Sequence, residues 1–233
     1  MPAHPDHVEV TGRALVTGTS SGIGAAIAAR LLRTGWQVTG VSRRPADIEH
    51  PNFTWHSADV TQPDELESLR AQRFDAVVHA AGLLRSAPLG KLTAADGEQM
   101  WRVHVQAAET LANILVDEMP DGARIVLIGS RTMTGTAGKS QYTATKAAML
   151  AMARSWAAEL APRGITVNVV APGPTATPML ADPGRSHTPP RKPPLGELVQ
   201  PDEVASLVTY LLGPNARNIT GQALIIDGGA GLS

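Results

Sequence analysis

Short apolar runs, many of them β-branched, alternate along the chain with longer segments that repeat apolar residues at helical spacing. Seven runs predict strands: Ala14–Thr17, Gln37–Val41, Phe53–His56, Ala76–His79, Arg124–Ile128, Thr166–Val170 and Ala223–Ile226. Five segments predict helices: Ile23–Thr34, Pro63–Gln72, Asp96–Met119, Ser140–Ala161 and Pro201–Leu212. Runs such as "RIVLI" lack polar alternation, which is typical of strands buried on both faces. The pattern predicts an α/β fold with a doubly wound, seven-stranded parallel sheet in one domain, residues 1–233.

A proline-rich segment interrupts this alternation after the sixth predicted strand. Nine of the eighteen prolines fall between residues 172 and 201, which excludes regular helix or central strand there. The segment should cross the carboxyl edge of the sheet, where ligands of open α/β sheets bind. We expect a substrate lid at about residues 174–200; the alternative is a surface linker.

Composition narrows the class of protein. The 233 residues are 43% apolar but only 3% aromatic, so aliphatic side chains and alanine must fill the core. A net charge of -1 gives no clustered positive surface for nucleic acid, and the absence of cysteine excludes disulfides and thiolate catalysis. The histidines show no ligand spacing, so no metal site is expected. With neither a secretory signal nor a stretch of about 18 apolar residues, we expect a cytoplasmic protein without a membrane partner.

The segment "TGTSSGIG" at residues 17–24 follows a predicted strand and opens a predicted helix. Gly18 would allow the tight turn, Gly22 would let the backbone approach a pyrophosphate, and Gly24 would let the helix pack closely on the sheet. Phosphates would then meet free N–H groups at the helix N-terminus. The segment predicts a dinucleotide site; the alternative is a purely structural turn.

The end of the second strand bears on the choice of cofactor. Doubly wound folds that bind NAD place an acidic residue near here, but this chain has Ser42, Arg43 and Arg44. Guanidinium groups match phosphate oxygens, so the two arginines favour the 2′-phosphate of NADP(H). If they belong only to a solvated loop, NAD(H) remains possible.

Several motifs in a fixed order resemble the short-chain dehydrogenase/reductase family over nearly the whole chain. They are "TGTSSGIG" at 17–24, "ADV" at 58–60, "HAAG" at 79–82, "IGS" at 128–130, "YTATK" at 142–146, "NVVAPGPTATPM" at 168–179 and "TGQALIIDGG" at 220–229. The pattern is most similar to 3-oxoacyl-carrier-protein reductases and related ketone reductases. The resemblance implies a Rossmann-like fold and a homotetramer or homodimer.

The resemblance also implies the roles of single residues. Tyr142 would be the general acid in ketone reduction, Lys146 would hold the nicotinamide ribose and lower the pKa of Tyr142, and Ser130 would bind the substrate carbonyl. The expected cofactor contacts are Gly18, Ser20, Ser21, Gly22, Ile23, Gly24, Ser42, Arg43, Arg44, Asp59, Val60, Ala80, Ala81, Gly82, Tyr142, Lys146, Pro172, Gly173, Thr175 and Thr177.

The chemistry of these residue types supports the same roles. Hydride transfer to a ketone leaves an alkoxide that needs a proton, and a phenol with an ordinary pKa of about 10 is a poor donor at neutral pH. A cation one helical turn away lowers that pKa, and Lys146 is four residues after Tyr142. Ser130 adds a donor where negative charge develops. The alternative for Tyr142 and Lys146 is a solvated pair on a helix surface.

Three features depart from the family pattern. "HAAG" puts His79 and Ala80 where asparagines are frequent, and His104 stands where the family has an asparagine in a long helix. Histidine could take over the expected role of that asparagine, holding a water that links Lys146 to solvent, and should then be neutral at pH 7. The alternative is that His104 only packs within the helix. The short segment from Arg44 to Phe74 predicts a short helix after the third strand.

The leading hypothesis is an NADP(H)-dependent oxidoreductase that interconverts a ketone and a secondary alcohol, with Tyr142 as general acid/base. An NAD-dependent alcohol dehydrogenase and a non-catalytic dinucleotide sensor are the alternatives; His104 favours the sensor, whereas the combination of Ser130, Tyr142 and Lys146 argues against it. The substrate would be a small carbonyl compound or alcohol. Basic residues of the expected substrate loops hint at an acidic one: Arg85, Arg131, Lys139, Arg185, Arg191 and Lys192.

Overall fold

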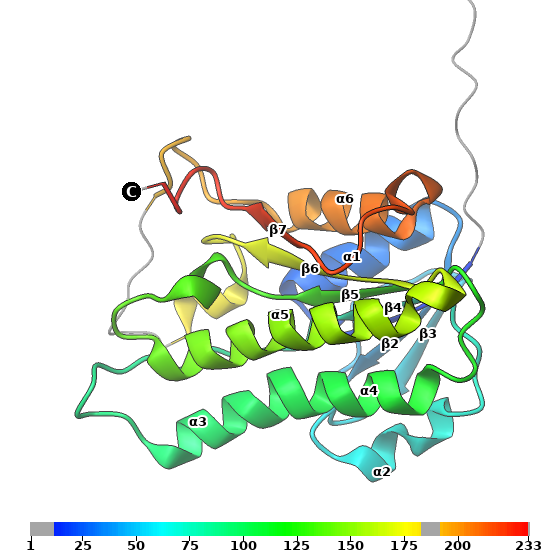
Figure 1. Cartoon of the computed structure of the whole chain (residues 1–233), viewed down its shortest axis with the longest axis horizontal. Helices are drawn as coiled ribbons and strands as arrows, with labels where there is room; N and C mark the ends of the chain where they lie inside the picture. Colours follow the sequence, from blue (N-terminus) through cyan, green and yellow to red (C-terminus); the bar gives the residue numbers. More distant parts are fainter. Residues whose placement is uncertain (1–11, 183–191, 233) are drawn as a thin grey trace, which may run out of the picture.

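The computed structural model describes residues 12–182 and 192–232. Its strands form one parallel sheet in the order β3-β2-β1-β4-β5-β6-β7 (Figure 1). The strands are β1 Arg13–Thr17, β2 Gln37–Ser42, β3 Phe53–Ser57, β4 Ala76–His79, β5 Arg124–Ile128, β6 Thr166–Pro172 and β7 Ala223–Ile226. The predicted fold class is confirmed, as are all seven predicted strands. β1 begins one residue earlier than expected, β2 and β3 end one residue later, and β6 ends two residues later.

Helices cover both faces of the sheet (Figure 1). On one face lie α1 (Gly22–Arg33) and α6 (Pro201–Leu212), which pack against each other; on the other lie α2 (Pro63–Leu66), α4 (Ala107–Leu115) and α5 (Ser140–Leu160). Successive residues of β5 alternate between the two cores, since Ile125 faces the α4 and α5 side and Val126 the α1 and α6 side. β4, β5 and β6 are buried at every position, which explains why their sequences show no polar alternation.

The order of the strands determines where a ligand can enter. β1 pairs with both β2 and β4, so the chain winds away from β1 in opposite directions. After β1 the chain turns to the face covered by α1, and after β4 to the face covered by α4; ligands of open α/β sheets bind at the carboxyl edge where this change of direction occurs. Loops after β2, β5 and β6 end at the same edge because all strands are parallel.

The long helix expected over Asp96–Met119 is continuous but not uniform. It begins as α3 (Ala94–Trp101), passes through a π-helical turn at Arg102–Gln106 and continues as α4. π-helical turns are rare and often occur at functional sites. The residue in the middle of this turn is His104, which the sequence singled out on other grounds.

Two further segments bear on the expectations. The helix expected at Pro63–Gln72 is reduced to α2 and a 3₁₀ turn, Glu67–Leu69, as the compactness of that region predicted. In the proline-rich segment, Pro178–Ala181 forms a 3₁₀ turn and Thr175 pairs with Val199. Residues 183–191 lie outside the described part of the chain, so the substrate lid stays a prediction. None of the helices in the described ranges is long and apolar enough to cross a membrane.

Candidate active site

A cavity of about 620 Å³ opens at the carboxyl edge of the sheet. Its volume falls within the range of small-molecule and cofactor sites. Every residue that the sequence predicted for catalysis or cofactor binding lines it, from the glycine loop after β1 to the segment after β6. The structure thus brings the whole predicted set into one site.

The glycines of the loop after β1 let neighbouring backbone segments come very close to it. Gly18 has φ +74, and a Cβ there would lie 2.9 Å from backbone atoms of Ala81 in the loop after β4. A Cβ on Gly24 would lie 2.4 Å from the carbonyl oxygen of Gly18, so α1 packs directly against the loop, as expected. The N-cap residue Ser21 makes no capping side-chain bond, and the first turn of α1 carries no acidic residue. Backbone N–H groups at this helix end are therefore suited to an anion.

Charged side chains line the part of the cavity that lies at the carboxyl ends of β2 and β3. Arg43 is largely exposed, and its Nη1 lies 3.7 Å from Oδ2 of Asp59. Asp59 is held by the backbone N–H and hydroxyl of Thr61, which both donate to its Oδ1. Ser42 is tied into the turn because its hydroxyl donates to the carbonyl of Arg44. A cation thus stands at the cavity wall where a sugar phosphate would require one.

Tyr142 and Lys146 lie on one face of α5 and are both buried, at 8% and 4% exposure. The Nζ of Lys146 is 5.7 Å from the centre of the Tyr142 ring, and it donates a 2.9 Å hydrogen bond to the carbonyl of Ile128 at the end of β5. Burial lowers the pKa of Lys146 to about 7. The pair is therefore not a solvated surface pair.

Ser130 follows β5 and is 7% exposed. Its Oγ accepts the backbone N–H of Thr132 at 3.2 Å and lies 2.9 Å from the Thr132 hydroxyl. If the Thr132 hydroxyl also donates, both lone pairs of Ser130 are used and its own proton is left for another acceptor. Ser130 and Tyr142 line the same cavity, which suits two donors to one substrate oxygen.

His104 reaches the same site from the π-helical turn and is fully buried. Its ring meets that of Tyr142 edge to face, with centroids 5.6 Å apart. Burial, and then the charge of Lys146, lower the pKa of His104 well below its ordinary value, in agreement with the expectation of a neutral ring. Both ring nitrogens contact protein groups, the N–H of Leu83 and the hydroxyl of Thr145.

Sequence reasoning missed three residues that hold the site together. Thr17 accepts the backbone N–H groups of Ala80 and Ala81, Thr145 contacts His104, and the carbonyl of Ile128 accepts from Lys146. Only Thr145 carried a signal in the sequence, since it is three residues after Tyr142 and must share its helix face. The other two contacts depend on how the strands are arranged.

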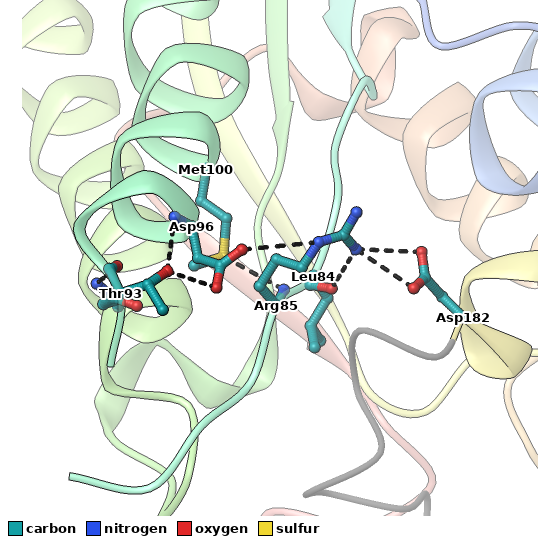
Figure 2. A network of polar contacts seen from close by, with 7 residues as sticks. Leu84, Arg85, Thr93, Asp96, Met100 and Asp182 are labelled. Carbon is teal, nitrogen blue, oxygen red and sulfur yellow. Dashed lines mark hydrogen bonds and ion pairs between the residues drawn. The ribbon is translucent and has the colours of Figure 1, made fainter. Parts of the chain in front are cut away.

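A network of polar contacts around Arg85 lies next to residues that line the cavity (Figure 2). The Arg85 Nη1 lies 3.2 Å from Oδ2 of Asp182, and its Nε lies 4.0 Å from Oδ1 of Asp96, near the start of α3. Nη1 also donates to the carbonyl of Leu84, a residue of the cavity lining. Because two carboxylates already face Arg85, its charge gives no support to the hint of an acidic substrate.

Replacing Arg85 by Gln should raise the KM for the substrate by about 3- to 10-fold and leave the Kd for NADPH unchanged. Asp182 directly follows the 3₁₀ turn Pro178–Ala181, which contributes to the cavity wall, so the loss of the cation frees that turn from α3. The pair is part-exposed, so stability should fall by only about 1 kcal/mol or less.

The matched control is Arg70→Gln, which breaks an exposed ion pair with Glu67 away from the cavity. Steady-state kinetics, NADPH fluorescence titration and thermal melts would be compared for the two variants. Equal KM values for Arg85→Gln and Arg70→Gln would show that the network does not shape the substrate site.

Comparisons with known proteins agree with this geometry. The family profile described as "Enoyl-(Acyl carrier protein) reductase" matches residues 18–231. A 3-oxoacyl-[acyl-carrier-protein] reductase from Vibrio cholerae is 35% identical, over 93% of this chain and 96% of the relative. A cyclic-di-GMP-binding biofilm dispersal mediator protein of Escherichia coli is 33% identical over the same shares.

The solved structures include a short-chain dehydrogenase from Burkholderia cenocepacia in complex with NADP. It is 34% identical, with a TM-score of 0.84 over 94% of this chain and 97% of that one. Profile, relatives and fold all lead to the same assignment. This chain belongs to the short-chain dehydrogenase/reductase family, a family of oxidoreductases.

Proposed function

We propose that this protein is an NADP(H)-dependent oxidoreductase that interconverts a ketone and a secondary alcohol, with Tyr142 as general acid/base. The observation that carries the proposal is the buried pair of Tyr142 and Lys146, which shares one cavity with Ser130 and the glycine loop. Burial of an amine beside a phenol stabilises no fold, since it lowers the pKa of Lys146 to about 7. A phenol that donates a proton at neutral pH, in contrast, requires a cation held beside it.

The residues of the cavity fit a dinucleotide with a 2′-phosphate. A Cβ at Gly18 would collide with the loop after β4, and a Cβ at Gly22 would crowd Thr177. Because neither residue has a side chain, space is left for the phosphates beside the uncapped start of α1. Arg43 and Arg44 would meet the 2′-phosphate, and Lys146 the nicotinamide ribose. The NADP in the Burkholderia cenocepacia relative supports this choice of cofactor.

In ketone reduction, NADPH bound in the cavity would supply the hydride. Tyr142 would donate its phenolic proton to the substrate oxygen as negative charge develops there. The ammonium of Lys146 would stabilise the resulting phenolate, because an opposite charge nearby favours the ionised form. Ser130 would donate a second hydrogen bond to the same oxygen and so fix the carbonyl against Tyr142. In alcohol oxidation the phenolate would take the proton back.

Replacing Arg43 by Ala should weaken NADPH binding by roughly 10- to 100-fold, because charge-assisted hydrogen bonds contribute about 1.5–3 kcal/mol. NADH lacks the 2′-phosphate and serves as the internal control, so its Kd should stay nearly unchanged. Fluorescence titration of the variant with both cofactors measures the difference. Equal losses for NADPH and NADH would place Arg43 outside the phosphate site and favour NAD(H).

A second candidate is a non-catalytic dinucleotide sensor. It is favoured by the relative named as cyclic-di-GMP-binding and by His104 in place of the expected asparagine. A sensor needs no proton donor, and the retention of Ser130, Tyr142 and Lys146 in one cavity supports the enzyme instead. The two candidates differ in turnover and not in cofactor binding.

Assembly and location remain part of the proposal. Tyr210 of α6 and Ile225 of the edge strand β7 are 48% and 58% exposed, which suits contact with a second copy. This supports the expected homotetramer or homodimer, which light scattering would measure. A cytoplasmic location is the expectation for a reductase that draws on NADPH.

The experiment that tests the proposed function combines binding and turnover. NADPH fluorescence establishes whether the cofactor binds, and loss of NADPH absorbance is then followed with 3-oxo esters, cyclic ketones and diketones. Turnover of at least one ketone is the expected result. Tight NADPH binding without turnover of any ketone would favour the sensor.

A further inference from the structure

Two buried histidines lie beside the catalytic pair, and the proposed mechanism assigns a step to neither. His79 ends β4 and is 1% exposed; His104 lies in the π-helical turn and is 0% exposed. Both stand where the family pattern favours asparagine. Buried polar rings without partners would be costly, so their contacts show what they do.

The partners of His79 fix its tautomer. Its Nε2 lies 2.9 Å from the carbonyl oxygen of Val103, which can only accept, so Nε2 carries the proton. Its Nδ1 lies 3.1 Å from the hydroxyl of Thr17. That hydroxyl already accepts the N–H groups of Ala80 and Ala81, so its own proton points to His79. His79 thus joins the ends of β1 and β4 to the π-helical turn.

The partners of His104 fix the opposite tautomer. Its Nε2 lies 3.1 Å from the backbone nitrogen of Leu83, which can only donate, so Nε2 is bare. Its Nδ1 lies 2.8 Å from the hydroxyl of Thr145, which donates its own proton to the carbonyl of Tyr142 at 2.8 Å. The proton on His104 is therefore on Nδ1. His104 joins the loop after β4 to the catalytic turn of α5.

The two sets of bonds meet in the backbone, since Val103 and His104 are consecutive residues of the π-helical turn. We propose that His79 and His104 act together as positioning residues, a two-histidine brace that sets the distance between the cofactor-lining loop Ala80–Leu83 and Tyr142. The proposal deepens the proposed function, because it rests on Tyr142 being the proton donor.

Several features keep the brace in one state. A second proton on either ring would face a group that has no free acceptor, namely the Thr17 hydroxyl or the Leu83 N–H. Burial, and then the charge of Lys146, lower the pKa of His79 to about 4 and lower the pKa of His104 well below its ordinary value. The lone pair of His104 Nε2 is occupied by Leu83, so the ring offers no nitrogen to a water beside Lys146. The brace is thus an alternative to the expected water relay.

The tautomers give a test that needs no substrate. Long-range nitrogen–proton NMR of the full chain with ¹⁵N-labelled histidine should show His79 protonated on Nε2 and His104 on Nδ1. Signals are assigned by their loss in the single His→Gln variants. Both rings in the same tautomer, or titration of either ring near its ordinary pKa, would overturn the brace even if no ketone were turned over.

The link to Tyr142 is tested on α5 with matched variants. Thr145→Val removes the hydroxyl between His104 and Tyr142, and Thr145→Ser restores it. The control is Thr143→Val, which removes from the same helix a buried hydroxyl with no hydrogen-bond partner among residues 12–182 and 192–232. With ethyl acetoacetate as probe ketone, Thr145→Val should lower kcat by about 10-fold, the value of one hydrogen bond. Thr145→Ser and Thr143→Val should keep the kcat of the unaltered chain.

Combining the changes separates the brace from the relay. His104→Leu should also lower kcat by about 10-fold, and the double variant with Thr145→Val should lose little more, because both remove the same connection. The Kd for NADPH and the melting temperature are measured in parallel, since a purely structural role would lower stability and leave kcat of the folded protein unchanged. A kcat for Thr145→Val equal to that of Thr143→Val, or independent losses in the double variant, would contradict the brace.

Discussion

Tyr142→Phe should lower kcat for ketone reduction by about 100- to 10,000-fold and leave the Kd for NADPH unchanged. The variant keeps the ring that packs edge to face on His104 and loses only the phenolic proton. General acid catalysis typically contributes a factor of this size. Within residues 12–182 and 192–232, no carboxylate forms an ion pair with Lys146 and could take over this role. Stopped-flow or steady-state loss of NADPH absorbance measures the effect.

The chain provides its own control for this change. It has two tyrosines, and the other, Tyr210, lies on α6 at 48% exposure. Tyr210→Phe removes the same atom from a residue that does not line the cavity and should leave kcat unchanged. Near-normal reduction by Tyr142→Phe would exclude Tyr142 as the proton donor.

Gly24→Ala should abolish cofactor binding at micromolar NADPH and lower the free energy of unfolding by about 1–3 kcal/mol, the usual cost of overpacking. The new Cβ would lie 2.4 Å from the carbonyl oxygen of Gly18 and 2.8 Å from that of Thr17, both backbone atoms that cannot move without the loop. In an ordinary helix the same change stabilises by roughly 0.5–1 kcal/mol, so the expected sign is the reverse of helix propensity.

Gly97→Ala is the matched control, because it too replaces a helical glycine. Its Cβ would meet only the side chain of Gln141, whose exposed hydrogen bond to the carbonyl of Thr93 can be exchanged for water when the amide turns away. Gly97→Ala should keep NADPH affinity and match or exceed the original stability, as measured by fluorescence titration and denaturant melts. Equal behaviour of Gly24→Ala and Gly97→Ala would mean that α1 does not need to approach the loop so closely.

Much of the site was predictable because the residues of each motif lie close together in the sequence. Gly18, Gly22 and Gly24 lie within one strand–loop–helix unit, and Tyr142 precedes Lys146 by one helical turn. Parallel strands then bring every strand end to one edge, so the hydrophobic pattern also predicts where these motifs meet. Burial on both faces gave the strands their uninterrupted apolar runs.

The connections between the motifs were not predictable, for physical reasons. The bond from His79 to Val103 joins residues 24 apart and depends on a π-helical turn, whereas the apolar pattern predicted a regular helix over Asp96–Met119. Arg85 and its ion-pair partner Asp182 are 97 residues apart. The sequence therefore did not show that the charge of Arg85 is paired within the protein. Residues that only the tertiary fold brings together have no fixed spacing in the sequence, so no motif reveals their contacts.

The central claim is that this cavity transfers hydride between NADPH and a ketone carbon. The most direct measurement is incubation of the full chain with NADPH deuterated at the transferring position of the nicotinamide and a panel of 3-oxo esters and cyclic ketones, followed by mass spectrometry of the products. The account predicts a secondary alcohol that carries deuterium on the former carbonyl carbon, formed by the unaltered chain and by Tyr210→Phe and lost in Tyr142→Phe. NADPH bound to the chain with no deuterated alcohol from any ketone would contradict it.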